Sequence, residues 1–132
     1  IKIKQAGKQK YKLELTKKGR KLLGQYNFLD FQISPKRRWD GNWRMFAFDV
    51  PERKRYARDI LRDKLKNLGF FQFQKSVWIY PHECEEEMRY ICEFLGMQSY
   101  TLIFTGKIHD DQLLRKYFLR EGVLRKTDLK RV

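Results

Sequence analysis

Cationic side chains dominate the residues of this chain that could do chemistry. Of its 132 residues, 30 are Lys or Arg and 16 are Asp or Glu, which gives a formal net charge of +14. A surplus of this size in a small chain attracts polyanions, so contact with nucleic acid is the first interpretation. An anionic membrane surface is the main rival for such a charge. A solvated basic surface without a partner is the neutral alternative.

The candidates for phosphate contact fall into four short clusters. They are a loop that contains a glycine, a run of three cations, one face of an expected helix, and a Lys-Ser pair between two expected strands. The residues are Lys8, Lys10, Lys36, Arg37, Arg38, Arg53, Arg55, Arg58, Arg62, Lys75 and Ser76. The helix face is offset by Asp59 and Asp63, and the Lys-Ser pair could serve only to shape a turn.

Acidic and metal-binding residues give weaker indications. Asp49 stands before Val-Pro-Glu, where an Asp commonly caps the following helix or pairs with an Arg. Glu52 is the nearest other carboxylate, so a general base is hard to name. His82, Cys84 and Cys92 are too few for a zinc site, and the spacing of the two cysteines fits one buried helix face. Two reduced thiols and the lack of an apolar stretch of roughly 20 residues favour a cytoplasmic protein without a membrane span.

The hydrophobic pattern predicts the elements that position these residues. Residues 1–15 alternate around a Gly-bearing loop, which predicts a hairpin, and a short helix over 17–23 ends at Gly24. Residues 25–42 form a linker. A strand over 44–48, a helix over 53–68, strands over 70–74 and 77–80, a helix over 83–95 and a strand over 100–104 follow.

This β-α-β-β-α-β order predicts an α+β, ferredoxin-like domain over residues 43–109, in which two helices cover an antiparallel sheet. Gly69 and Gly96 are expected to end the two helices. Trp43 and Trp78 could stack on bases, but their positions in strands favour packing in the core or at an interface. A further helix over 110–119 would open a C-terminal helical extension, residues 110–132.

Three short strings give the domain a family resemblance. They are Trp-Asp-Gly-Asn-Trp-Arg at 39–44, Phe-Asp-Val-Pro-Glu at 48–52 and Gln-Lys-Ser-Val-Trp-Ile at 74–79. With them, residues 39–105 resemble the middle domain of the phenylacetate-degradation repressor (PaaX) family of transcriptional regulators, which is similar to the CRISPR-associated endonuclease Cas2. Residues 11–23 resemble the end of a winged-helix module. The resemblance implies that residues 1–24 are its wing hairpin and last helix, with the recognition helix upstream of Ile1.

The resemblance implies a transcriptional regulator that binds double-stranded DNA, forms a homodimer through its Cas2-like domain and needs no cofactor. The alternative is a metal-dependent endonuclease acting on RNA or DNA. In that case Asp49 from each of two subunits would hold Mg²⁺ and activate water at a phosphodiester. A third possibility is an assembly module that only bridges partners. Catalysis is the less expected outcome.

Overall fold

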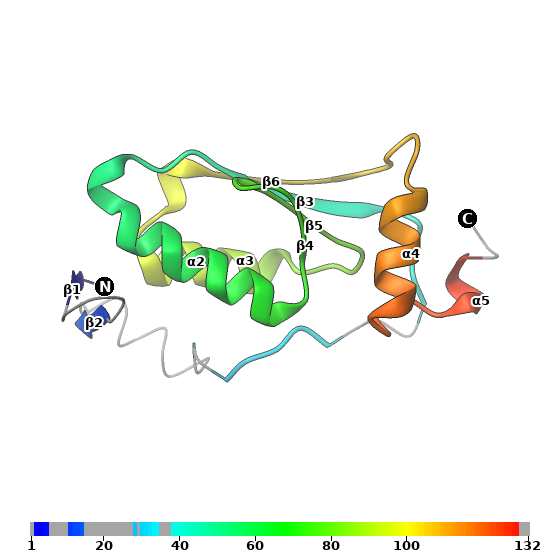
Figure 1. Ribbon diagram of the computed structural model, residues 1–132, viewed down its shortest axis with the longest axis horizontal. Helices are drawn as coiled ribbons and strands as arrows, with labels where there is room; N and C mark the ends of the chain where they lie inside the picture. Colours follow the sequence, from blue (N-terminus) through cyan, green and yellow to red (C-terminus); the bar gives the residue numbers. More distant parts are fainter. Residues whose placement is uncertain (1, 6–10, 15–27, 29, 35–37, 130–132) are drawn as a thin grey trace.

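A four-stranded antiparallel sheet with two helices on one face forms the centre of the molecule (Figure 1). The computed structural model describes residues 2–5, 11–14, 28, 30–34 and 38–129. The strands are β3 (Trp43–Phe48), β4 (Phe71–Gln74), β5 (Val77–Tyr80) and β6 (Thr101–Gly106). The helices are α2 (Arg55–Leu68), which follows a short 3-10 turn η1 (Glu52–Lys54), and α3 (Glu85–Leu95). A second 3-10 turn, η2 (Gln98–Tyr100), leads into β6.

The strand order β4-β5-β3-β6 confirms the ferredoxin-like prediction. The first strand of this sheet in sequence, β3, lies inside it and pairs antiparallel with both β5 and β6. The strands β4 and β5 form the hairpin that the sequence suggested, with an irregularity between Gln72 and Gln74. Each helix therefore crosses over the same face of the sheet, as the β-α-β-β-α-β order requires.

Both helices bury the apolar stripes that their sequences predict. The buried residues of α2 are Ala57, Leu61, Lys64, Leu65 and Leu68, and those of α3 are Met88, Tyr90, Ile91, Cys92, Phe94 and Leu95. Gly69 and Gly96 end the helices in the left-handed region, at φ values of 93° and 67°, where a residue with a Cβ is strained. Burial of each large apolar side chain contributes about 1.5–3 kcal/mol to the stability of this core.

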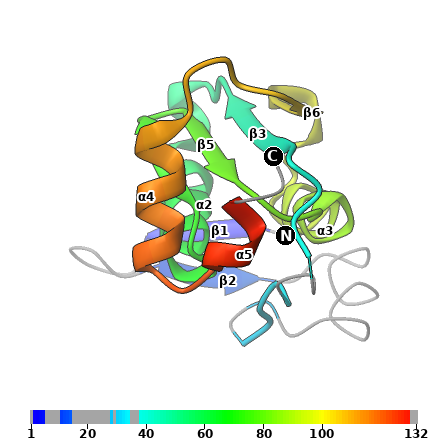
Figure 2. The same ribbon diagram turned by 90° about the vertical axis from the view of Figure 1, so that its right-hand side faces the viewer.

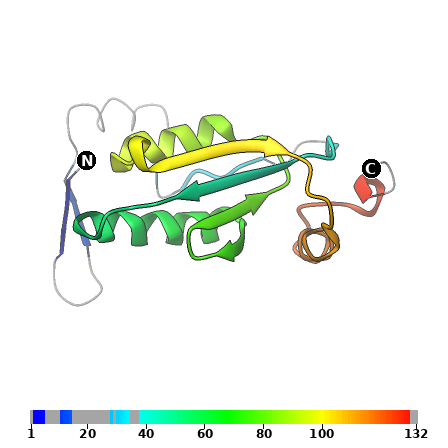
Figure 3. The same cartoon turned by 90° about the horizontal axis from the view of Figure 1, so that it is seen from above.

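The two faces of the sheet differ in what covers them. Phe46 and Trp78 are cross-strand partners, both are buried, and they face the helices. The opposite face is seen from above in Figure 3, and none of the helices that the structure describes crosses its middle. We call it the open face and define it by the side chains of Met45, Ala47, Val77, Leu102 and Phe104. Leu102 and Phe104 are 69% and 47% exposed.

The C-terminal helices α4 (Gln112–Arg120) and α5 (Lys126–Leu129) lie at one end of the sheet (Figure 2), and α4 confirms the predicted helix over 110–119. Phe118 of α4 packs against Trp43, with the ring centroids 5.7 Å apart. Asp128 of α5 accepts a hydrogen bond of 3.0 Å from the backbone N–H of Trp39. These contacts join the extension to the start of the central strand.

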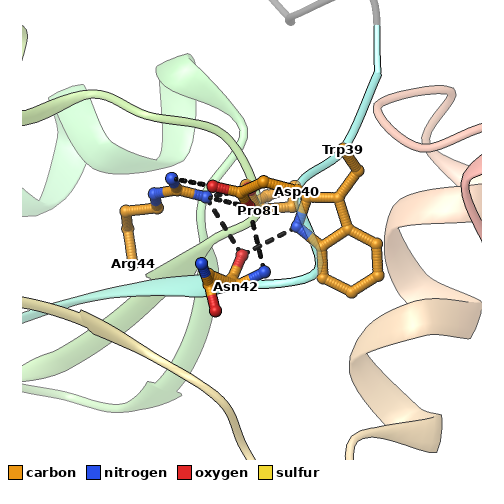
Figure 4. A network of polar contacts seen from close by, with 5 residues as sticks. All are labelled: Trp39, Asp40, Asn42, Arg44 and Pro81. Carbon is orange, nitrogen blue, oxygen red and sulfur yellow. Dashed lines mark hydrogen bonds and ion pairs between the residues drawn. The ribbon is translucent and has the colours of Figure 1, made fainter. Parts of the chain in front are cut away.

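The string at residues 39–44, one of the three that give the family resemblance, has a structural role (Figure 4). The side chain of Arg44 is 10% exposed and donates two hydrogen bonds, of 2.9 and 2.6 Å, to the carboxylate of Asp40. It also donates to the carbonyl oxygen of Pro81 at 2.8 Å. The hydrogen bonds from Arg44 are the main reason that the pKa of Asp40 falls to about 2. Trp39 Nε1 donates to the carbonyl of Asn42 at 2.7 Å, which completes the turn.

Near the N-terminus, β1 (Lys2–Gln5) and β2 (Tyr11–Glu14) pair antiparallel, which confirms the predicted hairpin at the level of the backbone. The predicted helix over 17–23 lies outside the described residues. Trp43 and Trp78 are fully buried, as their positions in strands suggested. Cys84 and Cys92 are buried as well, and burial raises the pKa of both thiols, that of Cys84 to about 12. Among the described helices, none has the length and apolar character to cross a bilayer.

Candidate functional site

Five of the candidate residues meet at one end of the sheet, where β3 ends beside the turn between β4 and β5. Asp49 follows β3 directly, and Lys75 and Ser76 form the turn. The backbone ties these segments together, because Phe48 N–H donates to the carbonyl of Ser76 at 3.0 Å and Asp49 N–H to that of Tyr100 at 2.9 Å. Arg53 and Arg62 reach the same region from the helical layer.

A hollow of about 570 Å³ lies at this end of the sheet. Asp49, Ser76, Ser99, Tyr100 and Thr101 supply its polar walls. Its apolar walls come from Phe48 and from three residues of the open face, namely Ala47, Val77 and Leu102. The hollow therefore continues the open face toward Asp49, so the two features form one surface.

The carboxylate of Asp49 is exposed and does not cap the helix that follows. Pro51 occupies the cap position of η1, and no side chain caps that turn. Asp49 also forms no ion pair within the part of the chain that the structure describes. Both structural roles considered for Asp49, capping and pairing with Arg, are therefore wrong for the described part of the chain. The cap position lies two residues further along the chain, at Pro51, whose side chain offers no hydrogen-bond acceptor.

A metal ion at Asp49 would need ligands from outside the single chain. Within residues 2–5, 11–14, 28, 30–34 and 38–129, no group of three or more His, Cys, Asp or Glu side chains is placed to hold one. Mg²⁺ prefers carboxylates and commonly keeps several waters. Asp49 alone fits such an ion only if water or a second copy of the chain completes the site.

The cations beside Asp49 are held in place by neighbouring groups. Arg53 donates a 2.9 Å hydrogen bond to the hydroxyl of Tyr100, which lines the hollow. Arg62 Nε donates to the carbonyl of Lys75 at 3.0 Å, and its guanidinium lies 5.7 Å from the centre of the Phe48 ring. Partial burial, and next the charge of Arg58, lower the pKa of Arg62, although an arginine remains protonated at neutral pH. These contacts orient Arg53 and Arg62 toward the Asp49 end of the sheet.

The predicted basic face of α2 is partly neutralised by acidic neighbours. Arg55 and Arg58 both lie 3.6 Å from the carboxylate of Glu52. Arg58 and Arg62 each approach Asp59 at 4.0 Å. Exposed ion pairs of this kind are weak, typically about 0–1 kcal/mol, but they reduce the field available to a polyanion. The α2 face is therefore a mixed surface rather than a one-signed one.

The charge surplus is instead concentrated before the domain. Residues 1–27 contain nine Lys or Arg and one Glu, whereas residues 43–109 contain eleven cations and nine anions. We call residues 1–27 the basic N-terminal region. Lys8 and Lys10 belong to it. These two, together with Lys36 and Arg37, lie outside the described residues, while Arg38 is exposed just before Trp39.

Sequence reasoning missed two features of this surface. The sequence predicts Tyr100 only as a strand residue, whereas in the structure Tyr100 holds Arg53 and lines the hollow. The sequence also predicts Leu102 and Phe104 as strand residues, but not that their side chains are exposed on one side of the sheet. The alternation of Leu102 and Phe104 with Ile103 was a signal, because residues two apart share one side of a strand. The sequence could not show that no helix would cover that side.

Comparison with protein families identifies the family of the central domain. Residues 36–117, more than half of the chain, match the family model of the PaaX protein central Cas2-like domain. Searches of curated proteins and of solved structures gave no match. The matched range begins before the structural turn at 39–44 and includes most of α4, which agrees with the contacts that join both segments to the sheet. The chain belongs to the PaaX protein family, and residues 36–117 are its central Cas2-like domain.

Proposed function

We propose that this chain is part of a DNA-binding transcriptional regulator, in which the basic N-terminal region contacts duplex DNA and the Cas2-like domain pairs two copies. The charge distribution carries the proposal. Nine of the 30 cations lie within the first 27 residues against a single acid, while the domain is close to neutral. Phosphate contacts supply most of the sequence-independent affinity of such proteins. Membership in the PaaX family also supports the proposal of a DNA-binding regulator.

The open face supports the pairing of two copies. In the four central strands, the residues that alternate onto this side include no Lys, Arg, Asp or Glu. Exposed apolar patches of this kind mark interaction surfaces. Two chains that each carry a charge of +14 repel one another across most surfaces, but an uncharged face lets them meet without opposed cations. A twofold pair would present two basic regions to two half-sites of an operator.

One observation favours a second candidate, a metal-dependent nuclease. The Asp49 carboxylate is exposed, and the hollow beside it opens on the face through which we propose that two copies meet. A pair of chains would thus supply two carboxylates, the ligands that Mg²⁺ prefers. Such an ion would activate water for attack on a phosphodiester, and Arg53 and Lys75 could bind the neighbouring phosphates.

A single assay separates the two functions. The chain is incubated with labelled duplex DNA and with labelled RNA, in Mg²⁺ or in chelator, and both binding and strand length are followed. The regulator predicts binding to duplex DNA that weakens steeply with salt, with intact strands in both conditions. Cleavage that requires Mg²⁺ and is lost in Asp49→Asn would establish the nuclease instead. Duplex binding that does not change between low and high salt would contradict the role of the basic region.

A further inference from the structure

The segment before the matched domain does not behave as a free linker. Phe28 and residues 30–33, which we call the strap, run along the helical layer on the side away from the sheet (Figures 1 and 3). Phe28 is 4% exposed and Ile33 is 7% exposed. The strap stands in sequence between the basic N-terminal region and the domain that starts at residue 36.

Aromatic rings attach the strap to α3. The Phe28 ring stacks on that of Phe94, with centroids 4.5 Å apart and an angle of 12° between the ring planes. The Phe31 ring meets the edge of Tyr90 at 5.3 Å and 77°. Aromatic pairs in such geometries add to the stabilisation given by their buried area. The strap therefore has a defined position on α3.

A buried lysine attaches the strap to α2. Lys64 is 5% exposed, and its ammonium donates a 2.9 Å hydrogen bond to the backbone carbonyl of Phe31. The same nitrogen lies 4.2 Å from the centre of the Phe31 ring, and it also donates to Asn67 Oδ1 at 3.3 Å. Gln32 Nε2 donates to the same Asn67 oxygen at 3.0 Å. A buried ammonium is costly unless it is satisfied, and here a carbonyl and a ring of the strap satisfy it.

We propose that the strap fixes the position of the basic N-terminal region relative to the Cas2-like domain, and that Lys64 is the positioning residue on which its docking depends. The strand β1 lies beside α2, so the chain contacts this helix both before and within the strap. The proposal rests on the proposed DNA-binding function and adds its regulation. In a pair of chains, a docked strap would hold the two basic regions at one separation, and release of the strap would let that separation vary.

A distance measurement tests the positioning directly. Spin labels are attached at Lys12→Cys in β2 and at Gln72→Cys in β4, while the two native cysteines remain buried and unlabelled. The parent chain should give a narrow distance distribution. Lys64→Met and Phe28→Ala should each broaden it, whereas Lys66→Met should leave it narrow. Lys66 is an exposed lysine on the same helix, so it matches the loss of charge. Equal widths in all four proteins would overturn the proposal.

DNA affinity then shows whether the positioning matters for function. Lys64→Met and Lys66→Met lose the same charge, but we expect Lys64→Met to lose about fivefold more affinity for duplex DNA. Phe28→Ala should show a similar loss, because the Phe28 ring attaches the strap to Phe94 of α3. If Lys64→Met broadens the distances but binds DNA as Lys66→Met does, the regulatory part of the proposal is wrong. If the parent chain fails to bind DNA, the proposed function fails, and the distance widths still decide whether the strap positions the N-terminal region.

Discussion

The indole nitrogen of Trp43 donates a 2.9 Å hydrogen bond to Asp111 Oδ2, across 68 residues of sequence. Asp111 also accepts a 2.7 Å hydrogen bond from Arg115 and occupies the cap position of α4. Burial alone would raise the pKa of Asp111, but the hydrogen bonds from Arg115 and Trp43 outweigh it and leave that pKa below its ordinary value. One carboxylate thus joins the central strand to the C-terminal helix.

Replacement of Asp111 should destabilise the whole domain. Asp111→Ala would leave the buried Trp43 N–H without an acceptor, which costs about 1–3 kcal/mol of the free energy of unfolding. Urea unfolding, followed by tryptophan fluorescence, measures this loss. Asp110→Ala provides the control, since Asp110 is exposed and adjacent, and its removal should change the free energy by less than about 0.5 kcal/mol. Equal losses in the two variants would show that the Trp43–Asp111 bond is not the cause.

Stability should fall as the pH drops below neutrality because of His82. This ring is 2% exposed, and its Nε2 lies 3.2 Å from the carbonyl of Val123, which requires the hydrogen on Nε2. Burial lowers the pKa of His82 below the ordinary value of 6.5 despite that hydrogen bond. The unfolded chain therefore takes up its proton first as the pH falls. The neutral His82 ring therefore contributes its full stabilisation of the folded state above about pH 6.5. As the pH falls from there toward the pKa of His82 in the folded chain, the free energy of unfolding decreases by at most about 1.4 kcal/mol per pH unit.

The free energy of unfolding at about pH 7.5 and about pH 5 measures this dependence. His82→Gln should remove most of the difference between the two conditions, whatever it does to stability at either one. His109→Gln should keep the difference, because His109 is exposed. A pH dependence that follows His109 instead would contradict the assignment.

A charge on the open face should prevent the pairing of two copies. Leu102→Glu or Phe104→Glu would place a carboxylate against an apolar partner surface, and we expect the dimer dissociation constant to rise at least about tenfold. Light scattering after size exclusion, over a range of concentrations, measures this constant. Leu113→Glu is the matched control, because Leu113 is 66% exposed, close to the 69% of Leu102, but lies on α4. A parent chain that stays monomeric at high concentration would contradict pairing through this face.

The salt dependence of DNA binding should report mainly on the basic N-terminal region. If Lys8 and Lys10 each neutralise one phosphate, their joint replacement by Gln should reduce the slope of log affinity against log salt by about 2. Arg55→Gln with Arg58→Gln removes the same charge from α2, but both arginines already pair with Glu52. We expect the joint replacement of Arg55 and Arg58 to change the slope of log affinity against log salt by less than about 1. If the α2 double variant changes this slope more than the Lys8 and Lys10 double variant does, the DNA contacts lie on the Cas2-like domain instead.

The sequence predicted much of the fold because local rules govern it. The spacing of apolar residues in α2 and α3 matches the helical repeat, and Gly69 and Gly96 end these helices since glycine tolerates a positive φ. The strands β3 and β6 were evident from short apolar runs. Element order then left few possible topologies, of which the ferredoxin-like sheet is the one observed.

The candidate site was less predictable. The Asp-Val-Pro-Glu string suggests that Asp49 caps a helix, but Pro51 occupies the cap position and Asp49 is exposed. The string at 39–44 is typical of the family, yet its residues hold one another and the sheet rather than a ligand. A short motif gives residue types and spacing, and it does not say which way each side chain points.

The amino-acid sequence by itself determined the helices and strands, their order, and the concentration of positive charge before the domain, because each depends on neighbours in the chain. Only the tertiary structure decided which arginines of α2 have acidic partners and which sheet face stays open. It also decided that Lys64 holds the backbone of Phe31. Lys64 and Phe31 lie 33 positions apart in the sequence, and the open face forms only when separate strands pair into the sheet. The ion pairs of α2 join residues that are close in sequence, but their side-chain orientations are set only in the folded chain.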